Sequence, residues 1–79
     1  MSKNLSYGLT SRQIEVFLFI DQFLRANGFA PSIRDIASSF KMAASSALDH
    51  LRALEKKGFI RRLPHRPRCL EILRKDFGE

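Results

Sequence analysis

The sequence predicts a mainly α-helical domain of three helices that ends in a small β-hairpin. Three stretches repeat apolar residues at spacings of three and four, as one face of a helix does, and each stops at a turn signal. Two short β-prone runs then flank a segment bracketed by prolines. The 79 residues have room for one domain, and 44% hydrophobic residues favour a packed core over disorder.

The net charge of +6 is concentrated in the second half of the chain. Residues 1–40 hold four Lys or Arg and three Asp or Glu, whereas residues 41–79 hold ten and five. Such an uneven distribution is typical of a protein that binds nucleic acid, although an anionic membrane or an acidic protein as the partner also fits it. A single cysteine, no signal-peptide pattern and no apolar run longer than Val16–Ile20 indicate a soluble protein of a reducing cytoplasm.

The first helix is predicted to follow a flexible arm at residues 1–8. Thr10 and Gln13 match a capping box, and Asn27-Gly28 supplies the stop. We expect the phenylalanines of this helix to pack in the core, not to stack on bases, because no basic residues are interleaved with them. The predicted inward positions are Ile14, Phe17, Leu18, Ile20, Phe23 and Leu24.

Residues 32–58 are predicted to form two short helices joined by a tight turn, which is a helix-turn-helix. Ser32 is expected to cap the first of these helices, and residues 41–43 to form the turn. The second helix is expected to open near Ser45 or Ser46 and to end at Gly58 in a left-handed conformation. The predicted inward positions are Ile33, Ile36, Ala37, Phe40, Ala47, Leu51 and Leu54.

A β-hairpin is predicted from residues 59–63 and 68–73, and the connector 29–31 could add one more short strand. In the second run, Leu70 and Ile72 share one face, and Cys69 and Glu71 share the other. The tip region carries no acid; its basic residues are Arg61, Arg62, His65, Arg66 and Arg68. Three helices and a basic hairpin predict a three-helix winged helix-turn-helix over residues 9–73, followed by a tail at 74–79.

Three runs of the sequence resemble one known family. LTSRQIEVFLFIDQFLRANGFAPSIRDIA, HLRALEKKGFIRR and HRPRCLEIL are similar, in order and spacing, to the N-terminal DNA-binding domain of LexA, the bacterial SOS repressor. The resemblance covers residues 9–73. It implies a transcriptional repressor of the bacterial cytoplasm or of a phage or plasmid, located at the nucleoid. Its partner would be double-stranded DNA, with the third helix in the major groove of a palindromic operator and the wing against the backbone.

The chain departs from the family pattern in three respects. Lys41 stands where the family usually has glycine, and the stretch of residues 36–50 is one residue shorter than its counterpart in the family. This leaves open the register of the third helix, called the reading helix below because it would lie in the major groove. If the deletion lies in the turn, Leu48 is exposed toward DNA in place of a polar or charged residue. The reading positions also differ from those of enterobacterial and Gram-positive members of the family, so an SOS operator is not assumed. The chain also ends at Glu79, before the linker and the self-cleaving peptidase domain of the family. We therefore expect no self-cleavage, and either an excised domain or a free-standing small regulator.

Candidate DNA contacts on the reading helix are Ser45, Ser46, Asp49 and Arg52. Either serine can reach a base edge or a phosphate, or act only as the N-cap. Asp49 can accept from a cytosine amino group or pair with Arg52 one turn on. Arg52 is expected on a phosphate, whereas Lys56 and Lys57 are expected to be solvated.

Further candidates lie outside the reading helix. Ser32 and Arg34 open a helix that crosses the DNA backbone in this motif, so they can contact phosphate, although Ser32 can serve only as a cap. His65, Arg66 and Arg68 are candidates for phosphate or minor-groove contacts from the wing, or form a plain solvated turn.

The residues do not indicate an enzyme. The chain has two histidines and one cysteine, and it contains no paired carboxylates, phosphate-binding glycine loop or CxxC spacing. No metal, cofactor, small-molecule ligand or membrane is expected. A homodimer on a palindromic site is the expected assembly, because one protomer reads one half-site. The alternative is a winged-helix protein-interaction module, such as a small effector of a host regulator.

Overall fold

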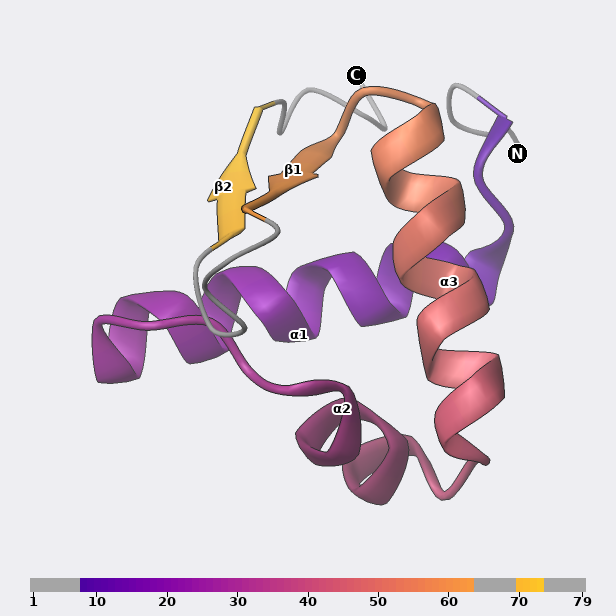
Figure 1. The fold of residues 1–79 in the computed structure, drawn as a ribbon, viewed down its shortest axis with the longest axis horizontal. Helices are drawn as coiled ribbons and strands as arrows, with labels where there is room; N and C mark the ends of the chain where they lie inside the picture. The colour runs from indigo at the N-terminus through magenta and orange to yellow at the C-terminus, as the bar shows by residue number, and fades with distance from the viewer. Residues whose placement is uncertain (1–7, 64–69, 74–79) are drawn as a thin grey trace.

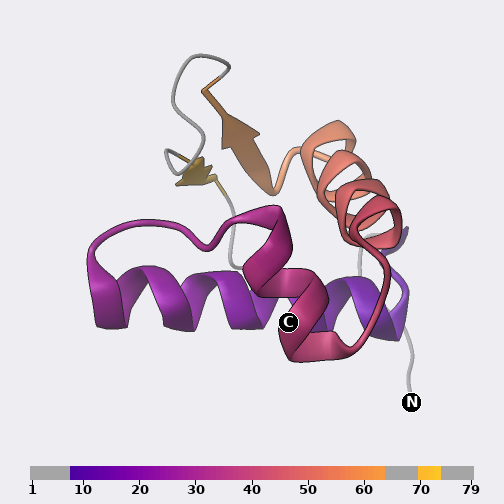
Figure 2. The same cartoon turned by 60° about the horizontal axis from the view of Figure 1, so that its bottom comes forward.

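The computed structural model describes residues 8–63 and 70–73. Its described elements are three helices, α1 (Ser11–Asn27), α2 (Ile33–Phe40) and α3 (Ala44–Lys56), and two strands, β1 (Ile60–Arg62) and β2 (Leu70–Ile72). Figure 1 shows α3 crossing α1, with its first turn on the side of α2 and its last turn leading toward β1. Figure 2, turned by 60°, shows α2 lying across α1. The predicted winged helix-turn-helix is confirmed.

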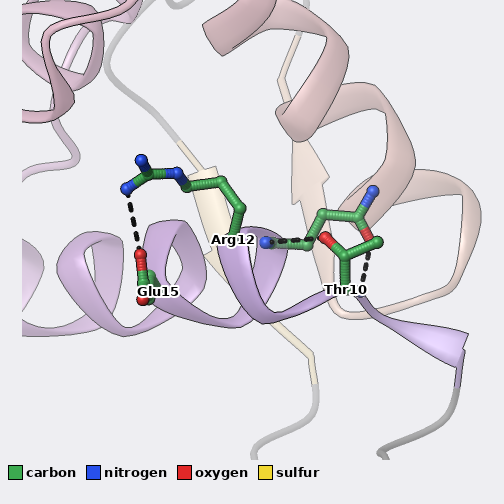
Figure 3. A network of polar contacts seen from close by, with 4 residues as sticks. Thr10, Arg12 and Glu15 are labelled. Carbon is green, nitrogen blue, oxygen red and sulfur yellow. Dashed lines mark hydrogen bonds and ion pairs between the residues drawn. The ribbon is translucent and has the colours of Figure 1, made fainter.

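Helix α1 begins and ends where the sequence predicts. The Thr10 hydroxyl accepts a hydrogen bond from the Gln13 backbone N–H at 3.1 Å, and Gln13 Oε1 accepts one from the Thr10 N–H at 3.0 Å (Figure 3). Gly28 ends the helix with φ 80°, and its N–H donates to the Leu24 carbonyl. Both ends of this helix are therefore fixed by local contacts.

Helix α2 also has a complete capping box. The Ser32 hydroxyl accepts from the Asp35 N–H, and Asp35 Oδ2 accepts from the Ser32 N–H, both at 3.0 Å. The helix ends at Lys41, which adopts the left-handed conformation with φ 54° and ψ 50°. The Met42 N–H then donates to the Ala37 carbonyl at 2.9 Å and closes the turn of the helix-turn-helix.

The start of α3 corrects the prediction that this helix opens near Ser45 or Ser46. Ala43 is the N-cap and Ala44 the first helical residue, and no side chain caps this end. The turn at Lys41 redirects the chain early, so the helix starts at residues that carry no capping signal. Its other end agrees with expectation, since Gly58 is left-handed with φ 84° and Phe59 N–H donates to the Leu54 carbonyl.

The core lies where the three helices and β1 meet. All the predicted inward positions of α2 and α3 are buried or pack on this core. The rings of Phe17 and Phe59 meet edge to face at 5.8 Å within it. One position of α1 was predicted wrongly, because Leu18 is 51% exposed while Val16 is fully buried. The largest fully buried side chains are Phe17, Phe59, Ile20, Ile36, Leu54, Ile60 and Val16.

The described sheet has two antiparallel strands, in the register Ile60↔Ile72, Arg61↔Glu71 and Arg62↔Leu70. Leu70 and Ile72 pack on the core and Glu71 is exposed, as the alternation predicts. The suggested strand at 29–31 is not present among the described residues. Ala30 is buried at 1% exposure, so the connector covers the core in an irregular path.

Candidate nucleic-acid interface

Helix α3 separates a buried face from an exposed one. Ala47, Leu51 and Leu54 are at most 3% exposed. The side chains on the opposite face are exposed and polar, namely Ser45, Ser46, Asp49 and Arg52. This is the arrangement expected if the missing residue lies in the turn. The prediction that Ala47, Leu51 and Leu54 face the core is therefore confirmed.

The two serines in the first turn of α3, Ser45 and Ser46, do not cap this helix. Because Ala43 is the N-cap, the suggestion that Ser45 or Ser46 caps this helix is wrong. Both serines belong to the first helical turn, and no side chain accepts a hydrogen bond from the N–H groups of this turn. The positive end of the helix dipole and two exposed hydroxyls therefore face the same surface.

Asp49 and Arg52 do not form the ion pair that was considered as an alternative. Both are exposed, and neither pairs with another side chain among residues 8–63 and 70–73. Their charges are therefore available to a ligand.

The two candidate residues at the start of α2, Ser32 and Arg34, differ in what their side chains do. The Ser32 hydroxyl and N–H are both used in the capping box, and the residue is partly buried. Arg34 is exposed and has no hydrogen-bonding or ionic partner in the described part of the chain. Ser32 thus fixes the helix start, and Arg34 offers a charge beside it.

The two arginines of the described strand β1 are each paired with an acid that lies outside the tip region. Arg61 pairs with Glu71 across the sheet, and Arg62 Nε lies 3.4 Å from Glu55 Oε1 at the end of α3. Lys57, expected to be solvated, donates from Nζ to the Gly8 carbonyl at 3.0 Å. The wing candidates His65, Arg66 and Arg68 lie outside the described residues, as do most of the arm, Cys69 and the tail.

On α1, too, the basic side chains are paired. Arg12 bonds Glu15 at 3.0 Å (Figure 3) and lies over the Phe40 ring, 5.3 Å from its centre. Arg25 pairs with Asp21 at 3.2 Å. Within residues 8–63 and 70–73, the basic side chains left without an ion pair or hydrogen bond are Arg34, Lys41, Arg52 and Lys56.

These four unpaired cations all belong to the helix-turn-helix, between the start of α2 and the end of α3. All four are exposed. Lys41 and Lys56 were not among the predicted contacts. The sequence already placed Lys41 in the turn. It did not show that the other basic side chains are paired, because those partners come together only in the folded chain.

Leu48 lies beside the exposed face of α3 but is half-buried, not fully exposed as expected. His50 is also half-buried. In the part of the chain that the structure describes, no group of three His, Cys, Asp or Glu side chains could hold a metal ion. No described helix is long and apolar enough to cross a membrane.

Comparison with known proteins identifies the family. The family model described as the LexA DNA binding domain matches residues 6–69, which is most of the chain. The chain belongs to the LexA DNA-binding domain family. The match includes α1, α2, α3 and β1, and it extends through the hairpin connection to the residue before β2.

Several relatives carry the name LexA repressor. The protein of Thermotoga maritima is 52% identical over 64 residues, which cover 81% of this chain and 32% of the relative. That of Thermosipho africanus is 45% identical over 67 residues, covering 85% and 34%. That of Staphylococcus aureus is 44% identical over 66 residues, covering 82% and 32%. The LexA-like chain thus spans about a third of the length of the curated relatives it matches.

Proposed function

We propose that this chain binds double-stranded DNA sequence-specifically through α3 and represses transcription in the manner that the name of its relatives indicates. The observation that carries the proposal is the surface of the helix-turn-helix. The exposed polar face of α3 lies in the same motif as four exposed cations that have no partner among the described residues, while basic groups on α1 and β1 are paired. Polar side chains read base edges, and unpaired cations bind phosphates.

Roles for individual residues follow from their positions. Ser45, Ser46 and Asp49, in the first turns of α3, are proposed to contact base edges in the major groove. Arg52 and Arg34 are proposed to bind phosphates. Ser32, as the cap of α2, is proposed to hold the start of this helix against the DNA backbone. From the wing, His65, Arg66 and Arg68 are proposed as phosphate or minor-groove contacts.

The proposed assembly on DNA is a homodimer on a palindromic site. A single α3 spans one half-site, and two half-sites related by a twofold axis require two protomers. A place in the SOS response and in the bacterial cytoplasm is proposed from the LexA repressor relatives alone. The role is binding and not catalysis, since the matched family is a DNA-binding domain.

The experiment that tests this function is selection from a randomised duplex pool with the purified 79-residue chain, followed by sequencing of the bound fraction. We expect enrichment of a twofold-symmetric consensus with half-sites about one helical turn apart or a multiple of that distance. Ser46→Ala should change the preferred bases. Recovery of unselected sequences at every salt concentration would overturn sequence-specific binding.

A further inference from the structure

Leu48 is the large apolar residue of α3 that the core does not use. Leu51 and Leu54 belong to the buried cluster, at 3% and 0% exposure. Leu48 is half-buried, but it is neither in that cluster nor among the partly buried side chains that pack against it. Its place on the helix therefore needs a reason other than the stability of this core.

Two of the neighbours that lie one turn from Leu48 on α3 are polar and exposed, whereas Ala44 is exposed and apolar and Leu51 is buried. Ser45 precedes it by one turn and Arg52 follows it by one turn, so the three side chains share one face. Asp49 is adjacent and exposed as well. Leu48 is thus the one large apolar side chain, itself half-buried, on the surface that is proposed to enter the major groove.

A protein partner does not suit such a surface. A stable protein interface buries on the order of 800 Å² on each side around an apolar centre that is depleted of charge. One leucine flanked by an arginine, an aspartate and serines does not provide such a centre. A ligand with one small apolar group among polar ones fits better.

The major groove presents such a group. Most of its base-edge atoms are hydrogen-bond donors or acceptors, and the C5 methyl group of thymine is its apolar feature. A leucine side chain makes no hydrogen bonds, so it can favour one base over another only by burying apolar surface or by excluding a polar group. Methylated cytosine carries the same C5 methyl group and offers the same contact.

We infer that Leu48 packs on the C5 methyl group of a pyrimidine in each operator half-site and selects for that group. This inference rests on the proposed function, because it requires α3 to lie in the major groove. It assigns to Leu48 a specificity that differs from hydrogen-bonded readout by Ser45, Ser46 and Asp49. Loss of the methyl group should weaken binding without changing the base pairing of the site.

The test replaces each thymine of the selected half-site, one at a time, by deoxyuridine, which lacks only the methyl group. With the wild-type chain we expect one position at which affinity falls about fourfold, the loss expected for one buried methyl-sized group. Leu48→Ala should bind thymine and deoxyuridine sites equally at that position. Leu48→Met, which keeps an apolar side chain of similar volume, should retain the preference.

The matched control is Leu18→Ala, which makes the same deletion at an exposed leucine of α1 and should retain the thymine preference. Melting temperatures of all variants establish that each is folded. The wild-type chain is also compared on cytosine and 5-methylcytosine at the same positions. A gain on methylation with no effect of deoxyuridine would support the contact and identify methylated cytosine as its source.

Two results would overturn the inference while leaving sequence-specific binding intact. In the first, wild-type affinity is unchanged by deoxyuridine and by cytosine methylation at every position. In the second, Leu48→Ala discriminates the methyl group as well as wild type does. Absence of any selected consensus would instead mean that the proposed function itself fails.

Discussion

At the scale of single residues, Lys41 holds a conformation that its side chain disfavours. Its φ of 54° is left-handed, and it is the only non-glycine residue with positive φ in the described part of the chain. We expect Lys41→Gly to raise the free energy of unfolding by about 1 kcal/mol, because the steric cost of a Cβ in this conformation exceeds the entropy that glycine adds to the unfolded chain. For a domain of this size the melting temperature should rise by about 4–8 °C.

The control for this prediction is Lys41→Ala, which removes the same charge but retains the Cβ. Its melting temperature should stay near that of wild type. Equal stabilisation by Lys41→Ala and Lys41→Gly would show that charge repulsion, and not backbone strain, is relieved.

Gly58 supports the opposite prediction at the end of α3. Its φ is 84°, and a Cβ added there would meet no atom within 4 Å, so any cost of substitution is conformational. We expect Gly58→Val to lower the free energy of unfolding by about 2 kcal/mol, measured by urea denaturation. Gly58→Asn should cost clearly less, since asparagine tolerates this conformation. Equal losses for the two variants would contradict this explanation.

At the scale of elements, the missing side-chain cap of α3 can be supplied. Ala43 already has the extended conformation of an N-cap, with φ −68° and ψ 152°, but it has no side-chain acceptor. Ala43→Ser should therefore stabilise the domain by about 1 kcal/mol in thermal unfolding. Ala44→Ser, one residue inside the helix, should give no gain. Stabilisation by both serines, or by neither, would contradict the assigned helix start.

The sequence predicts the helix ends well where a local signal exists. The capping boxes at Thr10 and Ser32 and the glycines at 28 and 58 act within a few residues, so their patterns are readable before the fold is known. The start of α3 was missed by one or two residues because Ala43 carries no signal. The exposure of Leu18 was missed because the inward face of α1 depends on what packs against it.

At the scale of the whole molecule, counting charges along the chain located the interface only in part. The second half is indeed the basic half, but Arg61 and Arg62 pair with Glu71 and Glu55, which only the folded chain brings close. Such surface pairs contribute about 0–1 kcal/mol each to stability. Their larger consequence concerns charge. Because these arginines are paired, the cations without partners among the described residues are those of the helix-turn-helix.

That distribution of unpaired charge predicts how DNA binding depends on salt. Four exposed cations on one protomer, each releasing about 0.9 counterion from duplex DNA, give a slope of log affinity against log salt of about −4 on a half-site duplex. Fluorescence anisotropy titrations at several salt concentrations measure this slope. The wing, if it contributes, makes the slope steeper.

A pair of charge-matched variants assigns the slope to the helix-turn-helix. Arg52→Gln should reduce its magnitude by about 1, because one phosphate contact is lost. Arg25→Gln removes the same net charge from α1, where the guanidinium already pairs with Asp21, and should leave the slope unchanged. Equal reductions would mean that affinity follows total charge, and a flat wild-type response would remove the phosphate contacts altogether. A reduction confined to Arg52→Gln requires the reading helix itself to lie against the duplex, because net charge is identical in the two variants.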